Sequence, residues 1–342
     1  MHSNELDLNT LRFSVHRVTF QIAGTPGSSL ELIANDFAHF ADNASGPPLF
    51  RIELNEQDPP YHEVPTRPAT VYTPRNVGLT EGTRTFVDYS GRALAIWDRG
   101  ERLFRIYTRD LDLQYEATYL FLLSRLGEEL DLRHLHRIHA LALGYNGRAI
   151  LSVLPMGGGK STLGAHLLKN PQFDFLSDDS PFLDANGSVH AFPLRLGLLP
   201  GFEGDIPKEY LRTIQRMEFG PKTLVDYRYF APRIRPSAEP GIVFLGKRSL
   251  STKCEILPCS PTDWSKSMIV NSVVGLGLYQ GLEFIMRSNV SELFGKAGVA
   301  WSRWRNARRL CQRSEVYHLI LGRDHEHNAR TIFEFVQSRL GK

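Results

Sequence analysis

Leu154-Pro-Met-Gly-Gly-Gly-Lys-Ser-Thr162 is the most informative segment of this chain. The apolar residues 148–154 before it have the composition of a short strand, and residues 161–168 after it have helical composition. In a glycine-rich turn between a strand and a helix, backbone amides close on phosphate oxygens, the lysine reaches the outer phosphates and the hydroxyl binds Mg²⁺. The stretch therefore predicts a phosphate-binding loop within an α/β fold.

The loop departs from the usual G-x-x-x-x-G-K-[ST] pattern at one position, because Leu154 replaces the first glycine. A GGGKST run in an ordinary surface loop is the alternative interpretation, and the flanking strand and helix favour nucleotide binding. The residues that we expect to contact the nucleotide are Pro155, Met156, Gly157, Gly158, Gly159, Lys160, Ser161, Thr162 and Lys222.

Composition bounds the class of protein. The chain has 342 residues, of which 42% are hydrophobic and 23% charged, as in ordinary globular proteins. A net charge of +3 does not by itself indicate a nucleic-acid or membrane partner. Three cysteines without a C-x-x-C pair are typical of reduced thiols. The N-terminus does not resemble a signal peptide, and residues 267–286 are short and polar for a membrane span, so we expect a cytoplasmic protein.

The first part of the chain is predicted to be rich in β-structure. Residues 11–22 and 49–54 have strand composition, and residues 83–108 indicate a meander with turns at Ser90-Gly91 and at 98–100. Prolines between residues 47 and 68 indicate a loop. A helix is predicted over 114–130 from its apolar period. We place the boundary near residue 112, with residues 1–112 as an accessory or substrate domain.

Residues 113–342 are predicted to form the nucleotide-binding domain. Strands are expected at 173–176, 241–245, 254–257 and 315–321, with a hairpin over 181–192 that turns at Asn186-Gly187. Helices are expected at 291–313 and 326–340. The alternation of strands and helices from residue 140 predicts an α/β core with a mixed sheet.

Two adjacent carboxylates, Asp178 and Asp179, end the predicted strand that follows the glycine loop. A nucleotide site places its metal-binding acid at such a strand end. Neighbouring strand residues point to opposite sides, so one acid is expected to hold Mg²⁺ and the other to serve as base toward an acceptor hydroxyl. A solvated turn or a helix cap is the alternative.

The order strand, glycine loop, short helix, strand and Asp-Asp resembles HPr kinase/phosphorylase and, more distantly, the ATP-dependent phosphoenolpyruvate carboxykinases. The resemblance covers residues 132–200, and His139 stands before the loop at the separation found in that family. It implies that Lys160 contacts the β- and γ-phosphates, that Ser161 and Asp178 serve the metal, and that Asp179 is the general base. His139 would then lie beside the transferring phosphate. The resemblance also favours an oligomer.

Departures from the family pattern limit what the resemblance implies. Thr162 stands where the bacterial enzyme commonly has an acid, and the E-I-R-G-L-G-I signature is only partly resembled by residues 193–198. Because that signature belongs to the phosphorylase reaction and to HPr, phosphorylation of HPr is not expected.

Basic residues are needed to neutralise the phosphoryl group during transfer. Arg195 and Lys222 are the preferred candidates, while Arg228, Arg233 and Arg235 lie in a segment that we interpret as a mobile lid or substrate contact. His134, His136 and His139 crowd one junction without an evident fourth zinc ligand.

The arginine-rich stretch 301–313 interleaves aromatic residues with arginines, a pattern also found in nucleic-acid-binding proteins, but the small net charge argues against that partner. A subunit interface or an acidic peptide fits the stretch better.

The sequence favours an ATP- and Mg²⁺-dependent kinase that transfers the γ-phosphoryl group to a hydroxyl of a peptide, protein or small molecule. Its catalytic residues are predicted to be Asp179, His139, Lys160 and Arg195. Two alternatives remain. One is a nucleotide-binding scaffold without chemistry, and the other is a carboxykinase-like lyase, which would need a metal set and an oxaloacetate site that the sequence does not display.

Overall fold

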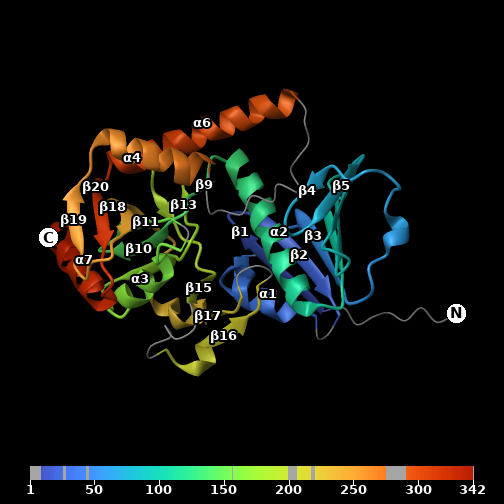
Figure 1. The fold of residues 1–342 in the computed structure, drawn as a ribbon, viewed down its shortest axis with the longest axis horizontal. Coiled ribbons are helices and arrows are strands. Elements are labelled where there is room, and N and C mark those ends of the chain that lie inside the picture. The colour runs from blue at the N-terminus through green and yellow to red at the C-terminus, as the bar shows by residue number, and fades with distance from the viewer. Residues whose placement is uncertain are drawn as a thin grey trace. The chain divides into compact units, whose positions relative to one another are not determined.

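The computed structural model describes residues 9–25, 28–43, 46–155, 157–198, 206–216, 220–274 and 290–341. Helices and strands are mixed in these residues, as the predicted α/β class requires (Figure 1). The chain forms two compact units. The first comprises Met1–Glu129, Ile214–Pro221 and Tyr279–Ser288, and the second comprises Leu130–Thr213, Lys222–Leu278 and Asn289–Lys342.

The first unit is built on an eight-stranded mixed sheet in the order β1-β2-β3-β8-β7-β6-β5-β4. Its strands are β1 (Asn9–Val15), β2 (Val18–Gly24), β3 (Phe50–Asn55), β4 (Val71–Tyr72), β5 (Val77–Glu81), β6 (Arg84–Asp88), β7 (Leu94–Asp98) and β8 (Leu103–Tyr107). Strand β3 pairs in parallel with β2 and β8, and the remaining pairs for which a register is described are antiparallel. The N-terminal part is thus rich in strands, as its composition predicts.

Two turns of the first unit, at Ser90-Gly91 and at His16-Arg17, differ in how clearly the sequence marks them. The expected meander is present, and its turn at Ser90-Gly91 has positive φ at both residues. The stretch 11–22 has strand composition and forms two strands, β1 and β2, whose hairpin turn is made by His16 and Arg17 with φ of 47° and 66°. Neither residue is a usual turn former, so the alternating pattern continues through the turn without a visible break.

Helices α1 (Leu30–Phe37) and α2 (Leu111–Leu132) complete the first unit, together with short 3₁₀ turns at Ala38–Asn43 and Tyr61–Glu63. Phe121 of α2 packs against Phe104 and Trp97, with ring centroids 4.0 and 5.0 Å apart. This packing explains why the first unit extends to Glu129 rather than ending near residue 112 as expected. The apolar face of the helix belongs to the sheet of the first unit, and its last residues lead into the second.

The second unit contains a nine-stranded mixed sheet with the central order β12-β10-β11-β18. Strand β20 pairs in parallel with β18 and antiparallel with β19. The strands are β9 (His136–Arg137), β10 (Leu141–Tyr145), β11 (Arg148–Val153), β12 (Asp174–Ser177), β13 (Phe182–Leu183), β14 (Val189–His190), β18 (Ser237–Arg248), β19 (Glu255–Pro258) and β20 (Glu315–Leu321). The hairpin predicted at Asn186-Gly187 is the β13–β14 pair.

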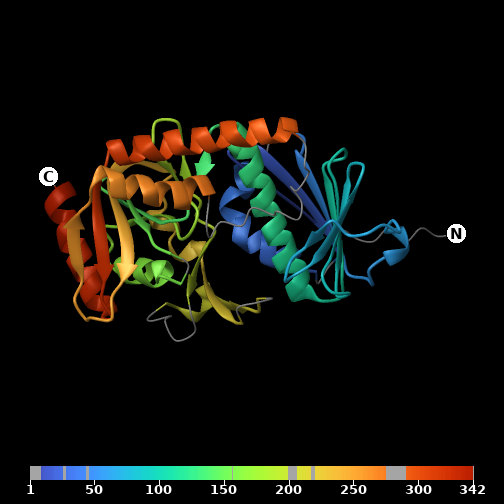
Figure 2. The same cartoon turned by 45° about the horizontal axis from the view of Figure 1, so that its top comes forward.

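Both faces of this sheet carry apolar side chains, because successive residues of β11 and β18 are apolar and point to opposite faces. Each face is therefore buried in a core of its own. Ile150 of β11 and Phe244 of β18 face one core, and Leu151 and Val243 face the other. The first core lies under α3 (Lys160–Leu167) and α7 (His325–Leu340), and the second under α4 (Pro261–Met268) and α6 (Val290–Gln312). Figure 2 shows α4 and α6 along one face of the sheet.

A small sheet, β15-β17-β16, completes the second unit. Its strands are β15 (Arg195–Leu198), β16 (Leu211–Ile214) and β17 (Lys222–Asp226), and the neighbouring 3₁₀ turns are Lys208–Tyr210, Tyr227–Tyr229 and Ala231–Arg233. The segment interpreted as an aperiodic mobile lid is therefore partly ordered, since β17 pairs with β15 in the register Gly197↔Leu224. Its alternation is only five residues long, too short to stand out between prolines.

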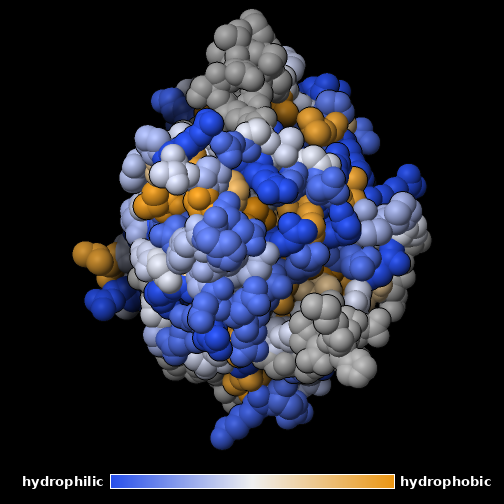
Figure 3. Space-filling model, turned by 90° about the vertical axis from the view of Figure 1, so that its right-hand side faces the viewer, coloured by the Kyte–Doolittle hydropathy of each residue, from blue (hydrophilic) through white to orange (hydrophobic). Residues whose placement is uncertain are grey.

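The face shown in Figure 3 is mostly hydrophilic, with hydrophobic residues in small areas between charged and polar ones. Among the described residues, no helix combines the length and the apolar character needed to cross a membrane. Of the stretch 267–286 considered in the sequence, residues up to 274 form the end of α4 and a π-helical turn, Ile269–Val274. The remainder lies outside the described residues.

Candidate functional site

The glycine loop connects the carboxyl end of β11, a strand inside the sheet, to α3. Gly157 and Gly159 have φ of +71° and +90°, a backbone conformation that favours glycine. Gly158 is required for a different reason, because a Cβ there would lie 2.8 Å from the carbonyl oxygen of Pro155. The three glycines therefore form a turn that other residues would strain, and Gly159 caps α3. Met156 lies outside the described residues.

Leu154 stands where the usual loop pattern has a glycine, but the backbone at this position does not require glycine. It is not among the described residues with positive φ, and its side chain is fully buried in the core beneath α3. A Cβ on Gly246 of β18 would lie 2.5 Å from a methyl carbon of Leu154, so the two residues fit closely together. What Leu154 offers to the loop is its carbonyl oxygen, which any residue would supply.

Lys160, the first residue of α3, turns back toward the loop. Its Nζ lies 3.1 Å from the carbonyl oxygen of Leu154 and 2.8 Å from Nε2 of His139. Only 7% of the residue is exposed. Burial lowers the pKa of Lys160, and the nearby charges of Asp179 and Asp178 oppose that shift. The ammonium group is thus held at the loop by contacts that an anionic ligand would exchange for phosphate oxygens.

Asp178 follows β12 and points toward the start of α3. Its Oδ2 accepts hydrogen bonds from Ser161 Oγ at 2.9 Å and from the amide of Gly197 at 3.0 Å. Its Oδ1 is buried and has no hydrogen-bond partner among the described residues. Burial raises the pKa of Asp178, as does the adjacent Asp179, while Lys222 opposes the shift. An unpartnered buried carboxylate oxygen beside a hydroxyl is a donor set that fits a hard divalent cation.

Asp179 points elsewhere, as expected for its neighbour in the chain, and 54% of its side chain is exposed. Its Oδ1 lies 3.2 Å from Nδ1 of His139 and 3.9 Å from Nζ of Lys160. Desolvation by the surrounding protein raises the pKa of Asp179, but His139 and then Lys160 outweigh it, so the pKa lies below the usual range. Asp179 is therefore an ionised, accessible carboxylate at the end of the lysine.

His139 is placed between these groups by two backbone hydrogen bonds. Its own amide donates to the carbonyl of Asn271 at 3.3 Å, and the amide of Ala140 donates to the carbonyl of Asp179 at 3.2 Å. His139 was predicted as a site residue from its spacing to the loop. The structure places it in contact with Lys160 and Asp179.

Lys222 and residues 195–198 reach the same site through the small sheet. A Cβ on Gly197 would lie 2.1 Å from both Cε and Nζ of Lys222, so the lysine crosses directly over this glycine. Its charge acts on Asp178, Asp179 and Lys160. Arg195 begins β15, two residues before Gly197 and on the same side of the strand.

The other basic candidates are engaged away from this cluster. Arg228 pairs with Asp226 at 2.6 Å, Arg233 donates to the carbonyl of Leu168 at 2.8 Å, and Arg235 lies 3.2 Å from Asp174. These contacts hold the arginines within the second unit, and the interpretation of the segment as a mobile lid or substrate contact stays a prediction.

The arginine-rich stretch on α6 has structural partners as well. Arg303 pairs with Asp131, Arg309 donates to the carbonyl of Ala185, and Arg313 pairs with Glu239. Arg303 and Arg309 of α6, and Arg313 directly after it, are therefore engaged within the second unit, which leaves less positive charge for a nucleic-acid or peptide partner.

Sequence reasoning missed Arg248, the last residue of β18. Its Nη1 would lie 4.0 Å from a Cβ on Gly159, at the start of α3. Because β18 runs parallel to β11, its carboxyl end reaches the edge of the sheet where the loop lies. The signal was present in the sequence as Lys247-Arg248, separated by one glycine from the apolar strand 241–245.

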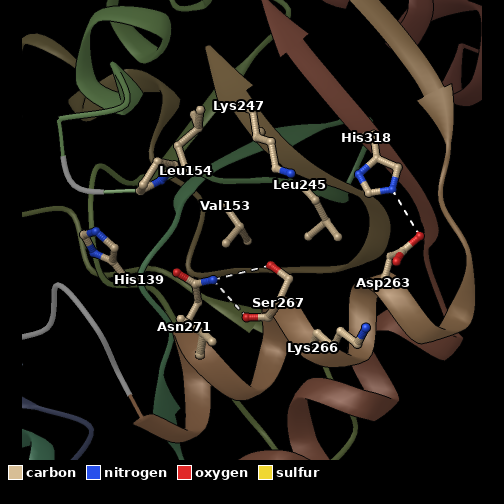
Figure 4. A pocket seen from close by; sticks show the side chains of 13 residues that line it. His139, Val153, Leu154, Leu245, Lys247, Asp263, Lys266, Ser267, Asn271 and His318 are labelled. Atoms are coloured by element: carbon tan, nitrogen blue, oxygen red, sulfur yellow. Dashed lines mark hydrogen bonds and ion pairs between the residues drawn. The ribbon is translucent and has the colours of Figure 1, made fainter.

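A pocket of about 680 Å³ opens beside the loop (Figure 4). Val153, Leu154 and Leu245 form its apolar wall, and α4 faces it with Lys266 and Ser267. Figure 4 shows His139 near one end and His318 with Asp263 at the other. The pocket therefore connects the surroundings of the loop with the junction of α4 and β20.

Comparisons with known proteins give no further identification, since no family model matches the chain and the search of curated proteins finds no match.

Proposed function

We propose that the protein is an ATP-dependent kinase of the HPr-kinase-like type, which transfers the γ-phosphoryl group to an acceptor hydroxyl. The observation that carries this proposal is the meeting of Lys160, His139 and Asp179 beside a glycine loop, with Asp178 bonded to Ser161. Each of these residue types has a part in phosphoryl transfer, and all lie at the carboxyl edge of one sheet.

ATP would bind with its phosphates along the loop. The amides at the start of α3 and the positive end of the helix favour phosphate oxygens. Lys160 would exchange the Leu154 carbonyl for the β- and γ-phosphates, a movement of the side chain alone. Lys222 and Arg248 lie where they would add positive charge.

A Mg²⁺ ion would be held by Ser161 and the unpartnered Oδ1 of Asp178. When bound, the ion neutralises the phosphate oxygens and orients the γ-phosphoryl group.

In the transfer step, Asp179 accepts the proton of the acceptor hydroxyl as the oxygen forms its bond to the γ-phosphorus. The bond between the γ-phosphorus and the bridging oxygen breaks, and ADP leaves with that electron pair. The exposure of Asp179 supports this part, since the base must reach an incoming hydroxyl. His139 would hold Asp179 in position from one side and face Lys160 on the other.

The test compares Lys160→Ala with Lys169→Ala. Lys169 lies just after α3 and pairs with the exposed Glu326 at 2.6 Å, away from the loop, so it is a matched control. Binding of MgATP is measured by calorimetry, and release of the γ-phosphate to water is measured with labelled ATP.

We expect Lys160→Ala to lower turnover by roughly 10²-fold or more, the scale of one lost preorganised contact, while Lys169→Ala behaves as the unaltered protein. The proposal would be wrong if the unaltered protein bound no MgATP or if Lys160→Ala bound and turned it over normally. Binding without any phosphate release, including toward candidate acceptor peptides followed by intact mass, would instead indicate a scaffold.

A further inference from the structure

Three side chains with different donor atoms meet at the end of the pocket that is away from His139. Cys259 directly follows β19, Asp263 lies in the first turn of α4, and His318 is in β20. One donor atom of each lies within 4.8 Å of the other two. A sulfur, a carboxylate oxygen and an imidazole nitrogen, brought together from three elements, form a donor set of the kind that holds zinc.

Backbone hydrogen bonds set the positions of these residues. The β19–β20 ladder places Leu257 opposite His318, and the amide of Cys259 extends it by donating to the carbonyl of Val316 at 3.3 Å. Ser260 then caps α4, and its Oγ accepts from the amide of Asp263 at 3.2 Å. The three ligands would therefore be presented by a rigid strand–turn–helix junction and not by a free loop.

Asp263 and Cys259 also make local contacts of their own. Asp263 accepts a hydrogen bond from Ser260 Oγ at 2.8 Å and lies 3.5 Å from Nε2 of His318, as a helix cap with an ion pair would. Cys259 donates from Sγ to the carbonyl of Ser260 at 3.5 Å, its sulfur accepts from the amide of Trp264, and its side chain packs against the core beneath α4 and α6.

The pocket supplies access to the cluster. Asp263 and His318 both line it, and Figure 4 shows their side chains facing each other at its edge. Three protein ligands leave one position of a tetrahedral ion for water or for a ligand in the pocket, the arrangement found in open zinc sites. Lys247 and Lys266 line the same space and would favour an anionic ligand there.

We propose that Cys259, Asp263 and His318 bind one zinc-class transition-metal ion, with its fourth position open to the pocket. Zinc lies about 2.3 Å from sulfur and about 2.0–2.1 Å from nitrogen or oxygen, which brings ligand atoms to roughly 3–4 Å from one another. Oδ2 of Asp263 and Nε2 of His318 already lie 3.5 Å apart, and no two of the three donor atoms are more than 4.8 Å apart, so binding needs a closure of about 1 Å at most. A thiolate ligand selects zinc-like ions over Mg²⁺, which prefers oxygen donors, so this site is separate from the phosphate loop in chemistry as well as in place.

The experiment titrates tag-free, metal-stripped protein with Co²⁺ and follows the absorption spectrum. A bound ion with a cysteine ligand is expected to show a thiolate-to-cobalt charge-transfer band and tetrahedral visible bands at one equivalent per chain, and Zn²⁺ should displace both. Cys259→Ser should remove the charge-transfer band. His318→Ala should weaken Co²⁺ binding by roughly tenfold or more, because losing even a residue that only hydrogen-bonds to a metal ligand lowers metal affinity by about that factor.

Cys254→Ser is the matched control, since Cys254 is a buried thiol just before β19 and is not part of the cluster. It should bind Co²⁺ with the unaltered spectrum, and circular dichroism should confirm that all three variants fold. The proposal would be overturned by a titration without a charge-transfer band, or by a band that persists in Cys259→Ser and disappears in Cys254→Ser. Neither outcome bears on MgATP binding at the loop.

Discussion

At the scale of single residues, Asp178 and Asp179 show how two adjacent carboxylates acquire opposite properties. Burial raises the pKa of Asp178, whereas His139 and Lys160 overcome desolvation and lower that of Asp179. Since one chain segment carries both, the difference comes from the direction in which each side chain leaves the strand. The pair therefore suits a division between holding a cation and accepting a proton.

This division predicts different losses for two isosteric variants. Asp178→Asn should weaken the dependence of ATP binding on Mg²⁺, because a cation ligand is lost. Asp179→Asn should keep MgATP binding and lower turnover by roughly 10²-fold or more, within the range of a general base. Calorimetry with and without Mg²⁺, together with phosphate release, separates the two, and identical effects of both variants would contradict the assignment.

The pH dependence follows from the lowered pKa of Asp179. A base acts only when ionised, so its contribution is present above its folded pKa and is lost as pH falls through that value. Because the folded pKa lies below that of an ordinary aspartate, turnover should show no acid limb from this residue between about pH 5 and pH 8. The measurement is the rate of phosphate release across that range, and a limb near neutrality that Asp179→Asn removes would contradict the prediction.

Gly197 offers a steric test of the role of Lys222. A Cβ at position 197 would lie 2.1 Å from Cε and Nζ of Lys222, so Gly197→Ala must displace the lysine. We expect weaker MgATP binding in calorimetry with little change in fold. Gly298→Ala on α6 is the control, since a Cβ there meets nothing within 4 Å. Equal affinity of the two variants would show that Lys222 does not contribute to binding.

At the scale of elements, α6 is fastened by a buried polar network at Asp131. The carboxylate lies 2.7 Å from Nδ1 of His136 and pairs with Arg303, and Nε2 of His136 lies 2.8 Å from Ser302 Oγ. Burial raises the pKa of Asp131, but His136 and Arg303 outweigh it and the pKa is lowered. Removing one charged partner of such a network leaves the opposite charge buried without compensation.

Asp131→Asn should therefore destabilise the second unit by about 3 kcal/mol at neutral pH. The carboxylate contributes stability above its unfolded pKa near 3.9 and loses it as pH falls through the lower folded value. The variant should thus differ most from the unaltered protein at neutral pH and least in acid. Urea unfolding followed by tryptophan fluorescence measures this, with the exposed Glu326→Gln as control, for which we expect less than about 1 kcal/mol.

The elements also show where sequence patterns suffice. The strand 315–321 was predicted at its observed bounds, and the Asn186-Gly187 hairpin was found, because their alternation and turn residues are unambiguous. The turn at His16-Arg17 and strand β17 were missed, since neither has a distinctive local signal and both depend on partners distant in sequence.

The same distinction holds for the candidate site. Lys160, Ser161 and the two aspartates were identified from the loop and its spacing, because they belong to one contiguous strand–loop–helix–strand segment. Arg248 and the cluster of Cys259, Asp263 and His318 were not, since only the pairing of β18, β19 and β20 brings them near their partners. A sequence motif therefore predicts residues that are near one another in the chain, whereas residues that meet only through the pairing of distant strands are found in the structure.

At the scale of the molecule, the proposed ATP site draws on segments spread over the second unit. The loop and α3, the end of β12, and strands β15 and β17 all contribute, although they are separated in sequence by up to several tens of residues. Ligand binding stabilises the unit that contains the site, by about 2.7 kcal/mol when free ligand is 100 times its Kd.

Hydrogen exchange with and without MgATP should therefore slow amides in several separate stretches at once. We expect added protection in residues 157–168, 174–179, 195–198 and 222–226, with no comparable change in strands β5 to β7 of the first unit. Lys160→Ala should abolish the difference under the same conditions. Protection confined to residues 157–168 would mean that ATP contacts the loop without engaging the aspartates or Lys222, and it would contradict the assembled site.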